Sequence, residues 1–548
     1  MEKNSEQKKP SIPELFKGKC IFITGATGFL GKVLLEKLLR SCPDIQEILV
    51  LLRPREPGTV ESRLSDLLKH KALLQAFDRI REECEHVLKK VKPLDGDLVA
   101  PNLGLSDEDL KKVINDVSFF FHCAANVRFD DEPRSTMRIN LLGVKNVLKI
   151  CHEIIKLEAF VHVSTAYAFC NQAFIDERIY REATTPDQII EILSWMSNRE
   201  LRSLCEFYLE GRPSLYHFSK ALAENLVCAN EPPLPAIIVR PSIVTASVSE
   251  PFPGWIDNYN GPSGFLMVCG KGVVRTLLVR KNVNADWVPV DTVANTLIVA
   301  AHYIAVKSKL PDSEVKLECP SKVPIVNCTC PNSNIISWMK VVSLCLPYLI
   351  KYPSSEVWSK PGGTVTSCYV HYKICQIFHH YIPAYITDSI AFIFRKKPRF
   401  VNMYHRIHGV MNHLQYYTNR KFFFLTRNMR KLVEDMEPAD AEIFPIDQNK
   451  LDWEEYMKNY VLGVRRYYLK ESDSTLESSR RKMMRYYYLW LTLKCASAIG
   501  VLYLFKKHHW KLWLCVKFVL PLPSSKSILE YSGISVLSGL GRRISVRA

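Results

Sequence analysis

The chain has 548 residues, of which 47% are apolar and 24% are charged, and its formal net charge is +17. This composition excludes a disordered polar chain, and the length excludes a single small core and favours about two to four domains. Seventeen cysteines without paired spacing, and an N-terminus without an apolar signal core, exclude a secreted disulfide scaffold and indicate free thiols in a reducing compartment.

Histidine and cysteine spacing predicts no metal site. His122 adjoins Cys123, and Cys328 lies two residues from Cys330. Neither pair has partners at the spacing of zinc ligands, so buried thiols are the favoured interpretation.

Strands and helices alternate after a polar arm at residues 1–17. Apolar runs predict strands over 20–24, 48–52, 117–123, 160–164 and 236–240. Helical periodicity predicts helices after residue 28 and over 58–92, 137–157 and 214–229. Strands that alternate with helices of this length predict an α/β fold, a Rossmann-type doubly wound parallel sheet covered on both faces.

The stretch TGATGFLG, Thr24–Gly31, follows the first strand and opens a helix. In its G-x-x-G-x-x-G spacing, Gly25 makes the tight turn, Gly28 lets the backbone approach a pyrophosphate and Gly31 permits close helix–strand packing. The strand–turn–helix context favours a dinucleotide loop over a merely structural glycine turn. The candidate cofactor-binding residues here are Thr24, Gly25, Thr27, Gly28, Phe29, Leu30 and Gly31.

The second strand ends in LVLLRP, with Arg53 at the position where an acid usually holds the ribose of a cofactor without a 2′-phosphate. A guanidinium pairs with a 2′-phosphate, so Arg53 favours NADP(H), and an exposed strand-end arginine is the alternative. Asp97 in GDL and Ala124 in HCAAN fall where such a sheet meets adenine and ribose.

Two later motifs carry candidate catalytic groups. The fourth strand ends in VHVSTAY, which presents Ser164 and Thr165 at the carboxyl edge of the sheet, where open α/β folds bind ligands. In YHFSKALAEN, Tyr216 and Lys220 lie four residues apart and therefore share one helix face. Pro241 follows the fifth strand, where the chain turns beside the nicotinamide in such sheets.

Aromatic-rich, basic helical segments replace this pattern from about residue 355 to about residue 470. We therefore predict four parts. They are the arm at 1–17, the sheet domain with its substrate-binding part at 18–354, a second, mostly helical domain at 355–475 and a basic, apolar tail at 476–548.

The tail from residue 471 onward contains 13 Lys or Arg against 4 Asp or Glu. Such an excess fits nucleic acid or an anionic membrane. Residues 486–505, which are nearly all apolar, carry one charge, Lys494, and have basic flanks, favour membrane lipid and no nucleic acid. The stretch is long enough for a transmembrane helix, and Lys494 makes a helix in the interface the alternative. A second apolar stretch, 512–523, is too short to span alone.

Together these motifs resemble the extended short-chain dehydrogenase/reductase superfamily and, within it, the fatty acyl-CoA reductases of animals and plants. The tail resembles that of insect members. The closer match rests on HCAANVRFD, YHFSKALAEN, GWIDNYNGPSG and ADWVPVD, and on the later HHYIPAYITDSI, FPIDQNKLDWEEY and YVLGVRRYYLK. It runs from about residue 11 to about residue 470.

By this resemblance, Tyr216 is the proton donor, and Lys220 binds the nicotinamide ribose and lowers the pKa of the tyrosine. Thr165 or Ser164 hydrogen-bonds the substrate oxygen, and Thr165 is favoured. The 52-residue gap between Ser164 and Tyr216 is long for this superfamily and would help to shape a site for a long acyl chain.

The resemblance implies that NADPH reduces a long-chain fatty acyl-CoA to a primary alcohol by two hydride transfers through an aldehyde, with release of CoA. It implies a membrane-associated enzyme that faces the cytosol, at the endoplasmic reticulum or the peroxisome, and leaves a homodimer open. Another extended reductase, such as a sterol or sugar-nucleotide dehydrogenase or epimerase, is the nearest alternative, although it leaves the helical domain unexplained. An idle NADP-binding membrane scaffold is the other, and the intact Gly25, Tyr216 and Lys220 argue against it.

Overall fold

The computed structural model describes residues 9–54, 58–69, 74–129, 131–309, 316–320 and 322–508. The chain divides into two compact units, one up to Met483 and one from Met484 onward. The sheet, the helices that cover it and the candidate site all belong to the first unit.

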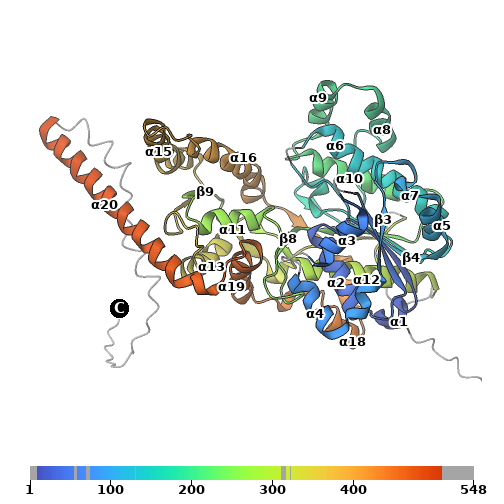
Figure 1. Ribbon diagram of the computed structural model, residues 1–548. Helices are drawn as coiled ribbons and strands as arrows, with labels where there is room; N and C mark the ends of the chain where they lie inside the picture. Colours follow the sequence, from blue (N-terminus) through green and yellow to red (C-terminus); the bar gives the residue numbers. More distant parts are fainter. Residues whose placement is uncertain are drawn as a thin grey trace, which may run out of the picture. The chain divides into compact units, whose positions relative to one another are not determined.

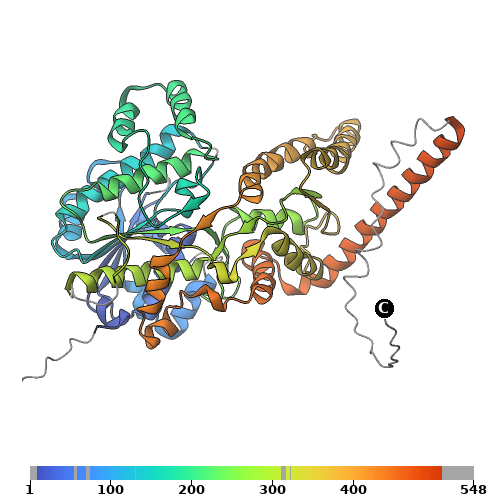
Figure 2. The same cartoon turned by 180° about the vertical axis from the view of Figure 1, so that it is seen from behind.

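A seven-stranded parallel sheet with helices on its faces forms one part of the first unit (Figure 1; Figure 2). Its strands follow the order β12-β7-β5-β4-β1-β2-β3. Chain connections run in opposite directions from β1, so the carboxyl ends of β1 and β4 flank the crevice where sheets of this type bind ligands. The bounds are β1 (Cys20–Thr24), β2 (Glu47–Leu52), β3 (Val91–Asp95), β4 (Val117–His122), β5 (Ala159–Val163), β7 (Ala236–Pro241) and β12 (Ile325–Cys328).

Alternate residues of each strand enter two separate cores, as the two-residue period of a strand requires. Ile21 and Ile23 of β1 face a core that includes α2 (Phe29–Ser41) and α12 (Val290–Lys309). Phe22 faces a second core with α7 (Gly143–Glu153) and α10 (Leu215–Cys228). Figure 1 shows these two helix pairs on opposite faces of the sheet, which confirms the predicted doubly wound α/β fold.

Two strands, β3 and β12, add to the five that the sequence predicts. The helical prediction over 58–92 resolves into α3 (Val60–Lys69), α4 (Leu74–Cys84) and a 3₁₀ turn at Glu85–Lys90, after which β3 begins. β3 is an edge strand and contains Pro93, whose missing N–H is tolerated there. β12 has four residues, and its register is set by β7, with Ile325 opposite Ile238.

The helical region after residue 355 is interleaved with the residues before it. β14 (Thr364–Thr366) pairs with β9 (Thr276–Leu278), and β15 (Phe423–Phe424) pairs with β6 (Phe174–Ile175). α19 (Trp453–Gly463) lies so close to Gly254 that a Cβ on this glycine would be 2.0 Å from the Asn459 carbonyl oxygen. The region thus helps to build the first unit.

The remaining helices and strands complete the first unit. The other helices are α1 (Ile12–Phe16), α5 (Asp107–Asp116), α6 (Pro133–Met137), α8 (Pro186–Trp195), α9 (Asn198–Tyr208), α11 (Pro262–Gly270), α13 (Trp338–Lys351), α14 (Tyr369–Gln376), α15 (Ile382–Ile393), α16 (Phe400–Asn419), α17 (Arg427–Glu434) and α18 (Pro438–Ile443). The other strands are β8 (Ile243–Thr245), β10 (Asn284–Ala285), β11 (Trp287–Pro289) and β13 (Ile336–Ser337).

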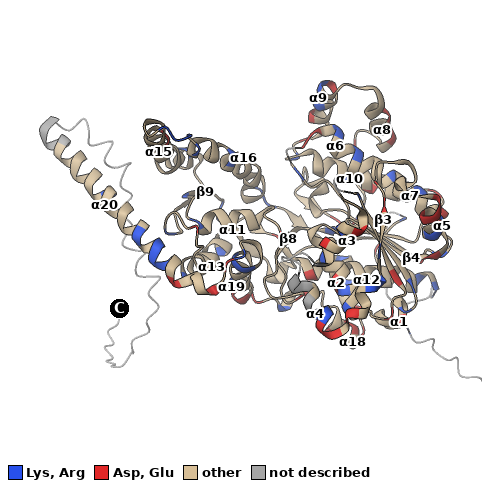
Figure 3. Ribbon diagram, in the orientation of Figure 1, with Lys and Arg blue, Asp and Glu red and all other residues tan. Residues whose placement is uncertain are grey.

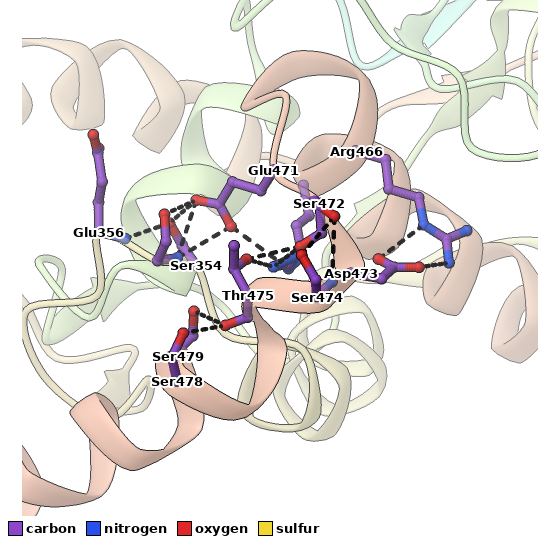
Figure 4. A network of polar contacts seen from close by, with 12 residues as sticks. Ser354, Glu356, Arg466, Glu471, Ser472, Asp473, Ser474, Thr475, Ser478 and Ser479 are labelled. Atoms are coloured by element: carbon purple, nitrogen blue, oxygen red, sulfur yellow. Dashed lines mark hydrogen bonds and ion pairs between the residues drawn. The ribbon is translucent and has the colours of Figure 1, made fainter.

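A polar network holds the end of the helical region (Figure 4). The Glu471 carboxylate accepts hydrogen bonds from Ser354 Oγ at 2.6 Å and from the Ser355 amide at 3.0 Å. Arg466 pairs with Asp473 at 2.6 Å. These contacts fix the chain just before α20 begins at Leu476.

The last described helix, α20 (Leu476–His508), carries a cluster of basic residues near its start, at 480–482 and 485, and Figure 3 shows this cluster. Among the described residues no helix is both long and apolar enough to cross a membrane, so the structure does not support the predicted transmembrane helix over 486–505. The stretch is helical, but its tyrosines, Thr492 and Lys494 lower its mean hydropathy. The second apolar stretch, 512–523, lies outside the described residues.

Candidate active site

The glycine turn after β1 has the geometry of a dinucleotide loop. Gly25 has a φ of +75°, and a Cβ on it would lie 2.6 Å from the Ala124 nitrogen. A Cβ on Gly31 would lie 2.2 Å from the Gly25 oxygen, whereas one on Gly28 would meet its nearest neighbour at 3.2 Å. Packing therefore requires Gly25 and Gly31. Gly28, at the N-cap of α2, leaves space for a pyrophosphate at the helix N-terminus.

Hydrogen bonds of Thr24 connect the start of the glycine turn to the end of β4. The buried Thr24 hydroxyl is bonded to His122 Nδ1 at 2.8 Å, and the Ala124 amide donates to the same hydroxyl at 3.4 Å. Thr24 thus joins β1 to β4 with its side chain. The members of the motif that line the cavity beyond the turn are Gly25, Thr27, Gly28, Phe29, Leu30 and Gly31.

Two arginines lie at the carboxyl end of β2. Arg53, which is largely exposed, lies 3.9 Å from the Asp97 carboxylate. Arg63 of α3 donates to the Arg53 carbonyl oxygen, and its Nη2 lies 3.4 Å from the Thr27 hydroxyl. Sequence reasoning missed Arg63, because its only signal was a cation on the next helix, and the fold alone brings it to the glycine turn.

The two hydroxyls at the end of β5 point to different partners. Ser164 Oγ donates to the Glu224 carboxylate at 2.5 Å, and Glu224 forms a fully buried ion pair with Arg240 at 2.5 Å. The Thr165 hydroxyl contacts the Tyr216 phenol and lies 3.4 Å from the Pro241 carbonyl oxygen. Ser164 is therefore engaged in the interior, whereas Thr165 lies beside the tyrosine.

Tyr216 and Lys220 lie on one face of α10, as the sequence predicts, and both line the cavity. Burial raises the pKa of Tyr216 to about 12, and the hydrogen bond with Thr165 opposes this rise. Burial lowers the pKa of Lys220 to about 8, against the attraction of Cys123 and Glu224. The Lys220 ammonium donates to the Val163 carbonyl oxygen at 2.7 Å. At neutral pH the phenol thus holds its proton and the lysine is largely charged.

A cavity of about 610 Å³ joins these groups. One end contains the glycine turn, Thr165, Tyr216, Lys220 and Pro241. The other end is walled mainly by apolar and aromatic side chains from α11, α13, α14 and α16 and from β9, among them Phe265, Leu277, Trp338, Val342, Tyr372, Met411 and Leu414. An elongated apolar ligand fits this end, with its reactive end at Tyr216.

The segment between Ser164 and Tyr216 does not form this apolar wall. Beyond Thr165, Tyr167 is its one contribution to the cavity lining among the described residues. Leu193 of α8 and Leu201 of α9 instead pack with Phe218, on the outer side of α10. The wall comes mainly from later elements, α11, β9 and α13 before residue 355 and α14 and α16 after it. That the segment shapes a site for an acyl chain stays a prediction.

Sequence reasoning also missed the hydrogen bonds of His217, the residue next to Tyr216. Its neighbour His217 is buried, with Nδ1 3.0 Å from Ser214 Oγ and Nε2 2.7 Å from the Tyr417 hydroxyl. Tyr417 belongs to α16, two hundred residues later. The contact links α10 to the helical region, and the adjacent histidine in YHFSK was its only sequence signal.

A parallel Rossmann sheet with a glycine turn and a Thr–Tyr–Lys arrangement defines a nicotinamide-dependent reductase of the extended short-chain type. The reductase domain of a non-ribosomal peptide synthetase from Mycobacterium tuberculosis shares this fold, with a TM-score of 0.52 at 17% identity over 83% of this chain and 93% of that one.

Sequence profiles described as male sterility protein match residues 23–297 and 379–471. The chain is 37% identical over 473 residues to fatty acyl-CoA reductase 1 of Mus musculus, covering 86% of this chain and 89% of the relative. It is 34% identical over 475 residues to fatty acyl-CoA reductase 2 of Homo sapiens, covering 87% and 89%. The chain belongs to the fatty acyl-CoA reductase family, as its motifs predict.

Proposed function

We propose that this enzyme uses NADPH to reduce long-chain fatty acyl-CoA to a primary alcohol in two steps. The observation that carries the proposal is the single cavity, in which Tyr216 lies at one end and apolar side chains line the other. A thioester carbonyl beside Tyr216 leaves its acyl chain on the apolar wall, because the polar groups gather at the end with the glycine turn.

Proton transfer in the first step falls to Tyr216. The nicotinamide, when bound, supplies the hydride that the carbonyl carbon accepts. The Tyr216 phenol then protonates the carbonyl oxygen, which gives a hemithioacetal, while Thr165 donates a hydrogen bond to that oxygen. When the hemithioacetal returns its hydroxyl proton to the phenolate, the C–S bond breaks. The CoA thiolate leaves and takes a proton from water, and an aldehyde remains.

The second step uses the same residues. The aldehyde carbon would accept a hydride from a second reduced nicotinamide, and Tyr216 again protonates the oxygen, so the product is a primary alcohol. The phenolate then regains its proton from water. Lys220 keeps a positive charge near the phenol and stabilises the phenolate that each proton donation leaves.

The test is to incubate the full chain with NADPH and acyl-CoAs of graded length and to measure fatty alcohol, aldehyde and free CoA. We expect alcohol and two NADPH oxidised for each CoA released. Aldehyde as the sole product would contradict the second step. The absence of any acyl-CoA reduction would overturn the proposed function.

Alkaline pH is expected to inactivate the enzyme through Lys220. Because its pKa is about 8 and that of Tyr216 is about 12, raising the pH through 8 removes the lysine charge while the phenol stays protonated. A pH profile of kcat/KM should therefore fall about tenfold per pH unit above 8. Lys220→Arg stays charged and should lose this alkaline limb, whatever its rate; an unchanged limb would assign it to another group.

Arg53 and Arg63 support NADPH over NADH, because Arg53 directly follows β2 and Arg63 contacts both the Arg53 carbonyl oxygen and the Thr27 hydroxyl. Replacing both with Ala is expected to lower kcat/KM for NADPH by about 100-fold, since charge-assisted hydrogen bonds to a phosphate are lost. The value for NADH should change less than about threefold. Equal losses for the two cofactors would show that the arginines serve the fold.

Membrane association through the tail completes the proposal, with the active site facing the cytosol at the endoplasmic reticulum or the peroxisome. α20 exposes large apolar side chains, including Leu493, Ile499 and Leu502, after its basic start, a pattern typical of interfacial helices. Removing residues 484–548 should lower the membrane-bound fraction at least about tenfold in a sedimentation assay. An unchanged bound fraction would exclude the tail as the anchor.

A further inference from the structure

The helical hairpin of α15 and α16 has an unusual surface. α15 buries Ala384 and Asp388, whereas its large apolar side chains stay exposed. The exposed set is Ile382, Tyr385, Ile386, Ile390, Phe392, Ile393 and, just after the helix, Phe394. The last three are 74%, 74% and 71% exposed. Soluble proteins rarely present so many adjacent large apolar groups to water unless the surface binds something.

Basic residues directly follow Phe392, Ile393 and Phe394 in the sequence. The turn between α15 and α16 contains Arg395, Lys396, Lys397 and Arg399, all exposed, and Figure 3 shows this basic turn beside α15. In the part of the chain that the structure describes, no acidic side chain forms an ion pair with these four residues. Residues 379–426 contain seven Lys or Arg and one acid, Asp388.

Asp388 does not offset the positive charge at the surface. Its carboxylate accepts hydrogen bonds from the amides of Arg399, Phe400 and Val401, at 2.9 to 3.0 Å. It thereby caps the N-terminus of α16 and fixes the turn, so that the aromatic tip and the cations are held on one rigid hairpin.

The inner side of the same hairpin reaches the active site. Met411 and Leu414 of α16 and Tyr372 of α14 line the cavity that contains Tyr216. Met411 and Tyr372 share a small core with Val274, which anchors the hairpin to the first unit. A lipid-facing surface on α15 would therefore be separated from the apolar end of the cavity by α16.

We propose that this hairpin is a membrane contact of the first unit. The side chains of Phe392, Ile393 and Phe394 enter the boundary between headgroups and acyl chains of an anionic bilayer, and the basic turn binds the lipid phosphates. Charge complementarity selects an anionic lipid surface over a second copy of the chain, because two copies would bring like cations together. The contact does not depend on the proposed reaction, and it is distinct from the tail.

The test places a photocrosslinking residue, p-benzoylphenylalanine, at Phe392 in the full chain and, as the matched control, at Phe207. Phe207 of α9 is 76% exposed, and no cluster of basic residues directly follows it in the sequence. Both chains are irradiated with phosphatidylcholine vesicles, with and without 30% phosphatidylserine. Because any anchoring by the tail is the same in both chains, the ratio of lipid adducts reports on the hairpin alone.

We expect at least tenfold more lipid adduct at Phe392 than at Phe207 on the vesicles with phosphatidylserine, and less on phosphatidylcholine alone. Lys396→Glu with Lys397→Glu should lower the Phe392 adduct at least fivefold while leaving the melting temperature unchanged. Equal yields at the two positions, no adduct at either, or crosslinks from Phe392 to residues 484–548 or to a second copy would each overturn the proposal.

Discussion

Replacing Tyr216 with Phe is expected to lower kcat for acyl-CoA reduction by about 10²–10⁴-fold, the range that a general acid contributes. The substitution removes the phenol that, in the proposed mechanism, protonates the substrate oxygen at the reactive end of the cavity. Because the pKa of Tyr216 is raised to about 12 by burial, the wild-type phenol is a proton donor throughout the physiological range. The measurement is single-turnover oxidation of NADPH together with the yield of alcohol.

Tyr416→Phe is the matched control for this experiment. Tyr416 lies on the same helix as Tyr417 and donates to the Cys170 carbonyl oxygen at 2.7 Å, away from the reactive groups. Its loss should leave kcat within about twofold, since a typical single hydrogen bond contributes only modestly. A Tyr216→Phe enzyme as active as this control would remove Tyr216 from the mechanism and leave another proton donor to be found.

Replacing Glu224 with Ala is expected to lower the free energy of unfolding by about 3–5 kcal/mol, because it leaves a fully buried cation without its counterion. Both side chains of the Glu224–Arg240 pair are 0% exposed. Arg240 also donates to the carbonyl oxygens of Asp176 and Arg178 at 2.9 Å, so the guanidinium cannot swing out to water without breaking these bonds. Denaturant unfolding of the two proteins measures the difference.

Two further variants test whether the buried, unpaired charge causes the loss of stability. Glu231→Ala removes an exposed partner of Lys322 and should leave the unfolding midpoint unchanged. The double variant Glu224→Leu with Arg240→Met removes both buried charges and should recover much of the lost stability. If the double variant is no more stable than Glu224→Ala, lost packing rather than an unpaired charge explains the defect.

The Glu224 site also shows where sequence reasoning reached its limit. The pattern VHVSTAY predicts two hydroxyls at the end of a strand, and local rules do not rank them. The structure distinguishes their contacts. The Ser164 hydroxyl donates to Glu224, sixty residues later on α10, whereas Thr165 contacts Tyr216, and both residues line the cavity. The same holds for the expectation that Lys220 lowers the pKa of Tyr216. The pKa of Tyr216 is raised instead, because residues far apart in the chain bury the phenol.

The sequence by itself determined the nucleotide turn, five strands of the sheet and the Tyr216–Lys220 face of α10. These features depend on contacts within a few residues: the φ of a glycine, the two-residue period of a strand and the spacing of one helical turn. Three features became evident only from the tertiary structure: the contact of Arg63 with the Arg53 backbone, the strands β3 and β12 that complete the sheet, and the place of α16 at the apolar end of the cavity. Those contacts join residues far apart in the chain, and the packing of the whole unit selects them.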